Sequence, residues 1–265
     1  MRAGFLLCAV FFAPDALAWG LQTHVFLAQW TLAAVPFADP QFRAAALRLP
    51  RLVLAGACLP DLALAGGMIG VRTFRRAHQW STLHRLATTC WDEERAIAVG
   101  YASHLLADVV AHNRFVPEHE RRIVDIPHAT HALCEWAMDE HVRAALQVEP
   151  AAVLAAEIAT LAEAAARTFR CRESVARRAI LFLARAERTL RATPLPRLCL
   201  RTVKALGTQA CFEAYLNEAK GLIRQIDAVL LGTMPRWQPE PDHAIRNEAA
   251  AISAPSAPPA ITSLG

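Results

Sequence analysis

The sequence predicts an all-α protein built as a single compact multi-helix domain. Alanine and leucine dominate the 265-residue chain, runs of β-branched residues are scarce, and apolar side chains recur at steps of three and four residues. Prolines stand between the periodic segments, where they mark helix boundaries. The clearest predicted helices span residues 25–34, 93–111, 132–146, 151–168, 174–193 and 202–231.

The chain opens with the features of a secretory signal peptide, predicted to span residues 1–18. A short basic start is followed by an apolar run, and Ala16 and Ala18 form an A-x-A cleavage site. Cleavage after Ala18 would leave Trp19 as the first residue of an exported protein, either secreted or periplasmic. Of the seven cysteines, Cys8 leaves with the signal, and disulfides and buried thiols both stay open for the other six.

The predicted helical domain spans residues 19–235. Residues 236–265 are rich in Pro, Ala and Ser, lack periodicity, and are predicted to form a disordered tail. No apolar run after the signal approaches the roughly 20 residues that span a bilayer, so we expect a soluble mature chain. The net charge of +4 indicates solubility rather than a particular partner.

The new amino terminus would itself be a candidate metal ligand. A freed α-amino group has a pKa of about 7.7–8.0, so its neutral form is available near working pH. Together with the carbonyl oxygen of Trp19 it can chelate a cation, and His24 can add an imidazole nitrogen nearby. Cleavage would therefore create a ligand that the precursor lacks.

One predicted helix carries His104, Asp108 and His112 among otherwise apolar residues. Steps of four residues turn about 400° on an α-helix, so the three side chains share one face. A buried row of imidazoles and carboxylates is costly unless something satisfies it, and a metal ion does so directly. A single His near an acid is more commonly a capped or solvent-facing pair, so this helix alone does not decide the matter.

Other candidate ligands lie before and after this helix. His131 and Glu135 are also four residues apart, and Asp139 is an alternative or additional acid, although the spacing favours Glu135. Asp61 follows a proline in an apolar turn, where a helix N-cap is the ordinary interpretation. His78 and His84 compete for one ligand position, and the nearby Trp80 favours His78.

Taken together, these residues form a nitrogen and oxygen ligand set of the kind that zinc prefers. The set is larger than one zinc ion needs and is sufficient for up to three. The candidate ligands are Trp19, His24, Asp61, His78, His104, Asp108, His112, His131 and Glu135.

The order of these motifs resembles the zinc-dependent phospholipase C and single-strand nuclease superfamily, which is all-helical. It is most similar to the branch of phosphatidylinositol-glycan phospholipase D and to bacterial zinc-dependent phospholipase C. The resemblance covers roughly residues 19–142. The motifs that carry it are Gly20-x-x-Thr23-His24, Pro60-Asp61, His78-x-Trp80, Ser103-His104-x-x-Ala107-Asp108 and His112.

The resemblance implies three zinc sites. The first site would use the positions of Asp61, His78, His104 and Asp108. The second would use those of His112, His131 and Glu135. The third would use the amine and carbonyl of Trp19 with His24, and Asp108 would bridge the third site to the first.

This resemblance implies a hydrolase in which metal-activated water attacks a phosphodiester, with Asp61 orienting that water or taking its proton. The expected partners are a phospholipid or another phosphodiester, with peripheral membrane-surface contact possible and no stable nucleic-acid partner. A single-strand nuclease or 3′-nucleotidase on the same scaffold stays an alternative, although the two tyrosines of this chain offer little for base stacking. A non-catalytic zinc-binding helical protein is the other alternative.

Overall fold

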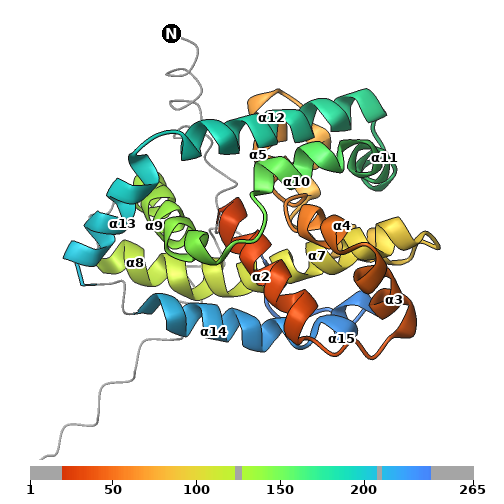
Figure 1. The fold of residues 1–265 in the computed structure, drawn as a ribbon, viewed down its shortest axis with the longest axis horizontal. Helices are drawn as coiled ribbons and strands as arrows, with labels where there is room; N and C mark the ends of the chain where they lie inside the picture. Colours follow the sequence, from red (N-terminus) through yellow and green to blue (C-terminus); the bar gives the residue numbers. More distant parts are fainter. Residues whose placement is uncertain (1–19, 123–126, 208–210, 240–265) are drawn as a thin grey trace, which may run out of the picture.

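A computed structural model describes residues 20–122, 127–207 and 211–239, and it confirms the all-α prediction (Figure 1). Within these ranges the chain forms helices and no β-strand. The predicted signal peptide, Trp19 and residues 240–265 lie outside the described residues. The helices are α2 (Leu21–Ala34), α3 (Pro40–Arg48), α4 (Pro50–Gly56), α5 (Leu62–Met68), η1 (Arg72–Arg76), α6 (Trp80–Ala87), α7 (Asp92–Val110), η2 (Ala111–Phe115), α8 (Val116–Arg122), α9 (Pro127–Val142), η3 (Arg143–Ala145), α10 (Pro150–Ala156), α11 (Ile158–Phe169), α12 (Glu173–Arg191), α13 (Leu195–Ala205), α14 (Phe212–Ile223) and α15 (Ile226–Leu230).

Helix α7 forms the centre of the molecule. Every side chain from Ala96 to Val110 is buried, which is the behaviour of a helix that is covered on all sides. It packs against α2, α3, α4, α6, α14 and α15. Figure 1 shows α7 crossing the middle of the fold, with α12 on one side and α14 on the other. Any polar side chain on the middle of α7 is therefore held deep in the protein.

Prolines mark helix starts as the sequence indicated. Pro40, Pro50 and Pro150 occupy the first turns of α3, α4 and α10, where a missing N–H costs nothing because that group has no partner within the helix. At the start of α3 the side chain of Asp39 also accepts hydrogen bonds from the backbone N–H groups of Gln41 and Phe42, at 2.8 and 3.0 Å.

The prediction of one helix over residues 202–231 is wrong. The chain forms α13, α14 and α15 instead, and α13 already begins at Leu195. Gly207 has a φ of +71°, a left-handed conformation that follows the end of α13 and cannot continue an α-helix. The predicted helix 151–168 is likewise interrupted, at Glu157, into α10 and α11.

Residues 236–239, at the start of the predicted tail, lie against the domain. The indole Nε1 of Trp80 donates to the carbonyl oxygen of Trp237 at 3.2 Å. The amide of Asn113 donates to the carbonyl oxygen of Gln238 at 3.1 Å. This part of the tail therefore covers α6 and the turn η2.

The structure also bears on the state of the cysteines and on whether a helix could span a membrane. Cys58, Cys90, Cys171, Cys199 and Cys211 are present as thiols, and Cys58 is fully buried. Among the described residues, none of the helices combines the length and the apolar character needed to cross a bilayer.

Candidate metal centre

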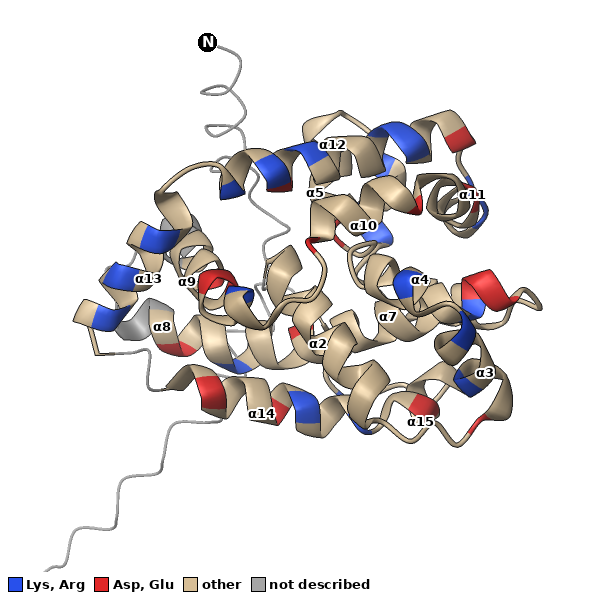
Figure 2. Cartoon of the chain, viewed as in Figure 1, with Lys and Arg blue, Asp and Glu red and all other residues tan. Residues whose placement is uncertain are grey.

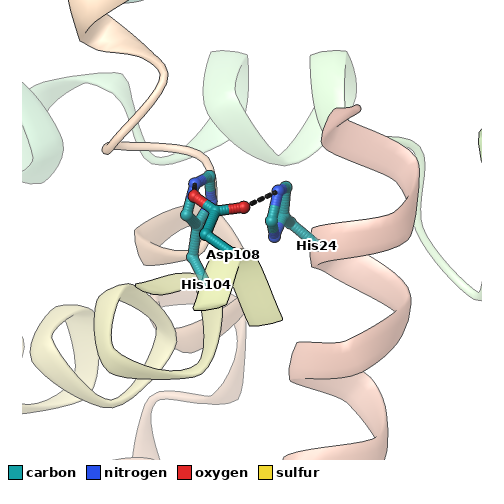
Figure 3. Close-up of side chains that lie close together, drawn as sticks. All are labelled: His24, His104 and Asp108. Carbon is teal, nitrogen blue, oxygen red and sulfur yellow. Dashed lines mark ion pairs between the residues drawn. The ribbon is translucent and has the colours of Figure 1, made fainter. Parts of the chain in front are cut away.

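Asp108 lies at the centre of a cluster of histidines inside the fold. Its side chain is fully buried on α7, and its two carboxylate oxygens face different partners (Figure 3). Oδ1 lies 3.3 Å from Nε2 of His24 on α2, and Oδ2 lies 2.9 Å from Nε2 of His104, one turn earlier on α7. Burial raises the pKa of Asp108, and the neighbouring His104 and His78 oppose that rise.

The other members of the cluster come from the segment between α4 and α6. Nε2 of His78 lies 3.5 Å from Oδ2 of Asp108 and 3.3 Å from Nε2 of His104. Asp61, at the start of α5, places its Oδ1 3.7 Å from Nε2 of His78. Two overlapping groups result, each with ligand atoms close enough together to hold a metal ion. They are His24, His104 and Asp108, and Asp61, His78 and His104.

The tautomer of His104 follows from its second contact. Its Nδ1 lies 2.7 Å from the backbone carbonyl oxygen of Ala57, and a carbonyl can only accept, so Nδ1 carries the hydrogen. In the neutral ring Nε2 is then a lone pair that points into the cluster. A backbone carbonyl that orients a histidine in this way is the usual outer support of a metal-binding imidazole.

Three of these five interatomic distances fit a tetrahedral zinc site, whereas the 2.9 Å from His104 to Asp108 is shorter and the 3.7 Å from Asp61 to His78 is longer. Ligand atoms about 2.0–2.2 Å from zinc lie about 3.3–3.6 Å from one another in a tetrahedron. Nε2 of His78 lies at 3.3 Å from His104 and 3.5 Å from Asp108, within that interval. Neither oxygen of Asp108 accepts a hydrogen bond from the described residues, although imidazole nitrogens surround it. Imidazole nitrogens and carboxylate oxygens that converge in this way suit a bound cation.

Close packing of α4 on α7 brings the carbonyl of Ala57 to His104. A β-carbon added to Gly100 would lie 1.8 Å from the carbonyl oxygen of Val53, and one added to Gly56 would lie 2.4 Å from that of Ile97. Only glycine permits this approach of the two backbones. Gly100 precedes His104 by one turn, and Gly56 directly precedes Ala57. The close crossing of α4 and α7 therefore positions the carbonyl oxygen of Ala57 against Nδ1 of His104.

A second group lies further along the chain. Nε2 of His131 and Oε1 of Glu135 are 2.8 Å apart on α9, as their four-residue spacing predicts, and the rings of His112 and His131 have centroids 5.5 Å apart. Burial, followed by the nearby charges of Asp61, Asp139 and Asp108, raises the pKa of Glu135 well above its usual value.

His112 does not continue the α-helical row of His104 and Asp108. It lies in η2, a π-helical turn that directly follows α7. A π turn rotates each residue less than an α-helix does, so it redirects the side chains that it contains. His104 and Asp108 share one face of α7, and the ring of His112 lies beside that of His131 on α9.

Asp139 has a different set of partners from those of Glu135. It is fully buried and accepts hydrogen bonds from the backbone N–H and the hydroxyl of Thr23, at 2.9 and 2.7 Å, and it pairs with Arg191 of α12. Burial raises its pKa to about 6, which Arg191 opposes. Arg191 also contacts Glu187 at 2.8 Å, and Glu187 accepts from Gln22 at 3.2 Å.

This network fixes the first turn of α2, one residue before His24, and sequence reasoning did not find it. Its only signal in the sequence was the Gly20-x-x-Thr23-His24 motif, because Arg191 stands among many other arginines of α12. The other alternative ligand, His84, is exposed on α6 and lies outside the cluster around Asp108, near Gly232. Trp19 lies outside the described residues.

Comparison with known proteins agrees with this geometry. The family model described as zinc-dependent phospholipase C matches residues 23–173, which include every candidate ligand from His24 to Glu135. No curated protein and no solved structure matches the chain. A match over more than half of the sequence, together with buried clusters of His and Asp that could hold metal ions, shows that the chain belongs to the zinc-dependent phospholipase C family.

Proposed function

We propose that this chain is an exported, zinc-dependent phospholipase C-like hydrolase that cleaves a phosphodiester. Family membership supports the class of reaction. The single observation that carries the proposal is the convergence of His24, His78 and His104, from three separate segments, on the buried carboxylate of Asp108, with Asp61 beside His78. Evolution seldom buries so many titratable groups together without a ligand, because unpaired buried charges are strongly destabilising.

We assign up to three zinc ions to the chain. The ligands of the first are Asp61, His78, His104 and Asp108, and those of the second are His112, His131 and Glu135. The third would be held by the amine and carbonyl of Trp19 together with His24. Asp108 would serve both the first and the third site, and the different partners of its two oxygens support this assignment.

Bound zinc would supply a Lewis acid that activates water and neutralises charge on phosphate. The protein's own groups then divide the remaining work. Asp61 is the acid of the main cluster whose side chain retains contact with solvent, with 8% exposed against 0% for Asp108, so its carboxylate is the group that orients the attacking water or takes its proton. Because Nδ1 of His104 donates to the carbonyl oxygen of Ala57, the lone pair of Nε2 stays aimed into the cluster.

The proposed substrate is a phospholipid headgroup or another phosphodiester, reached after export and removal of residues 1–18. No stable nucleic-acid partner is part of this proposal. Among residues 174 to 207, which include eight Lys or Arg residues, the only aromatic side chain is Phe182. Base stacking on several aromatic residues is the usual means of holding a single strand.

The decisive experiment is an assay of the purified, processed protein against phosphatidylcholine, phosphatidylinositol and single-stranded DNA. We expect release of a phosphorylated headgroup and diacylglycerol, loss of activity on chelation, and recovery on addition of zinc. Phosphatidic acid as the product would assign D-type cleavage instead. Cleavage of DNA alone, or lipid hydrolysis that chelation leaves unchanged, would overturn the proposal.

The third zinc site has its own test. In Trp19→Ala the amine and carbonyl remain, so activity and zinc content should largely persist after correct processing. An additional Ser before Trp19 displaces the amine by one residue and should lower both strongly. If the two variants had the same activity and zinc content, the amino terminus would not be a zinc ligand.

A further inference from the structure

One surface of the molecule carries most of its excess positive charge. From Glu173 to Gly207 the chain has eight Lys or Arg residues and two acids, Glu173, which pairs with Arg177, and Glu187, which is buried against Arg191. The whole chain has a net charge of +4, so a segment of +6 leaves a net −2 for the rest of the protein. The charge is therefore concentrated on α12 and α13 rather than spread over the surface.

The cations of these two helices point outward. Arg178, Leu181, Arg185 and Arg188 recur at steps of three and four on the exposed face of α12, opposite the buried Ile180, Leu183 and Ala184. The exposed residues of α13 include Arg197, Leu198, Arg201 and Lys204. Figure 2 shows Lys and Arg along α12, at the top of the view, and along α13, at its left.

Most of these Lys and Arg side chains form no ion pair with an Asp or Glu among the described residues. Arg177 pairs with Glu173, Arg191 pairs with Asp139 and Glu187, and Arg197 lies 3.5 Å from Glu140. Within the described residues, no acid forms an ion pair with the remaining five, which are Arg178, Arg185, Arg188, Arg201 and Lys204. Their charges are thus available to an external partner.

Two leucines add an apolar component to the same face. The exposed fractions of Leu181 and Leu198 are 45% and 49%, which is high for leucines in the middle of helices. On a bilayer, leucines among arginines can enter the headgroup region while the arginines contact lipid phosphate.

The position of this surface relates it to the metal centre. Helix α12 packs against α5, which begins after Asp61, and α13 packs against α9, which carries His131 and Glu135. The side chains of Asp61 and His131 are 8% and 12% exposed, so these two proposed ligands keep some contact with solvent. The basic face therefore lies on the two helices that pack directly against α5 and α9.

We propose that the outward face of α12 and α13 docks the protein on an anionic phospholipid bilayer. The proposal rests on the proposed function, since a lipid surface is where a phospholipase C-like enzyme would find its substrate. Phosphate headgroups complement the five available cations, and each Lys or Arg near an anionic surface contributes about 1 kcal/mol. A nucleic acid fits less well because the face offers no exposed aromatic residue for stacking.

The test measures sedimentation with vesicles of phosphatidylcholine, with and without phosphatidylglycerol, at increasing salt. Asp61→Asn serves as the background to prevent turnover during the measurement. We expect binding only when phosphatidylglycerol is present, and a decline with added salt. Reversal in Arg185→Glu/Arg188→Glu should weaken partitioning at least about 30-fold, because the two lost cations contribute about 1 kcal/mol each.

A matched control variant has the same change in net charge at a site away from α12 and α13. Arg43→Glu/Arg224→Glu alters two exposed arginines on α3 and after α14 and should leave vesicle binding unchanged, with circular dichroism showing that both double variants are folded. Equal loss in both variants, no loss in either, or binding of single-stranded DNA in place of vesicles would overturn the docking surface. Hydrolysis of a dissolved short-chain phosphatidylcholine by the wild-type protein tests the proposed function separately, because it needs no bilayer.

Discussion

Gly20 and Asp139 stand in direct contact, 119 positions apart in the sequence: a β-carbon added to Gly20 would lie 2.1 Å from Oδ2 of Asp139. The same carboxylate accepts the hydrogen bonds of Thr23 and pairs with Arg191. Because His24 follows Thr23 directly, this contact sets where the first imidazole of the metal centre lies.

Replacement of Gly20 should therefore disturb the metal centre. In Gly20→Ala the added methyl group must displace either the start of α2 or Asp139, and overpacking of this kind costs about 1–3 kcal/mol. We expect a lower free energy of unfolding and weaker zinc binding, measured by denaturant titration and by metal analysis. Gly221→Ala is the control, since nothing lies within 4 Å of its added β-carbon and alanine favours the helix. Full zinc content in Gly20→Ala would show that the contact is not needed.

A second glycine tests the support of His104. Gly100→Ala would force α4 away from α7, because the new β-carbon would meet the carbonyl oxygen of Val53 at 1.8 Å. The separation would also break the hydrogen bond from Nδ1 of His104 to the carbonyl oxygen of Ala57. Loss of such an outer support typically lowers metal affinity about 10–100-fold. A zinc titration should show this loss together with a lower melting temperature, and a lower melting temperature with unchanged zinc affinity would contradict it.

Asp108 is expected to matter for more than one metal ion. Asp108→Asn removes the charge that faces both His24 and the pair of His78 and His104. Metal analysis should show loss of more than one zinc per chain, and hydrolysis should fall more than about 100-fold, beyond the effect of outer supports. Asp92→Asn, at the exposed start of the same helix, should retain full zinc content. Loss of a single zinc ion would argue against the bridging role.

The stability of the metal-free protein should depend on pH through Asp139. Its pKa is raised to about 6 by burial, whereas an aspartate of the unfolded chain titrates near 3.8. The folded state thus holds this proton more tightly, so the contribution of Asp139 is complete below about pH 4 and is lost as the pH rises through 6. A shift of about two pKa units corresponds to about 3 kcal/mol as an order of magnitude.

Asp139→Asn provides the reference for that measurement. In the presence of a chelator, the difference in free energy of unfolding between wild type and Asp139→Asn should fall between about pH 4 and 6 and then level off. A difference that stays constant, or that rises over this interval, would show that the carboxylate of Asp139 is not held in the protonated form by the fold.

The sequence predicted the helical class and the long central helix because their apolar periodicity is local information. It also predicted the pairing of His131 with Glu135, which depends only on helical spacing. The sequence did not predict the turn η2, since no residue type specifies a π turn. Nor did it predict the pair of Asp139 and Arg191, because these residues lie 52 positions apart and resemble ordinary residues of amphipathic helices.

Arg191 lies beyond residue 173, where the family match ends, yet it holds Asp139 against the beginning of the domain. During synthesis, nearly 170 residues must follow the start of α2 before Arg191 is available to pair with Asp139. The start of α2 accordingly reaches its final position only after residues 139 and 191 have been made, so the position of His24 is set late in folding.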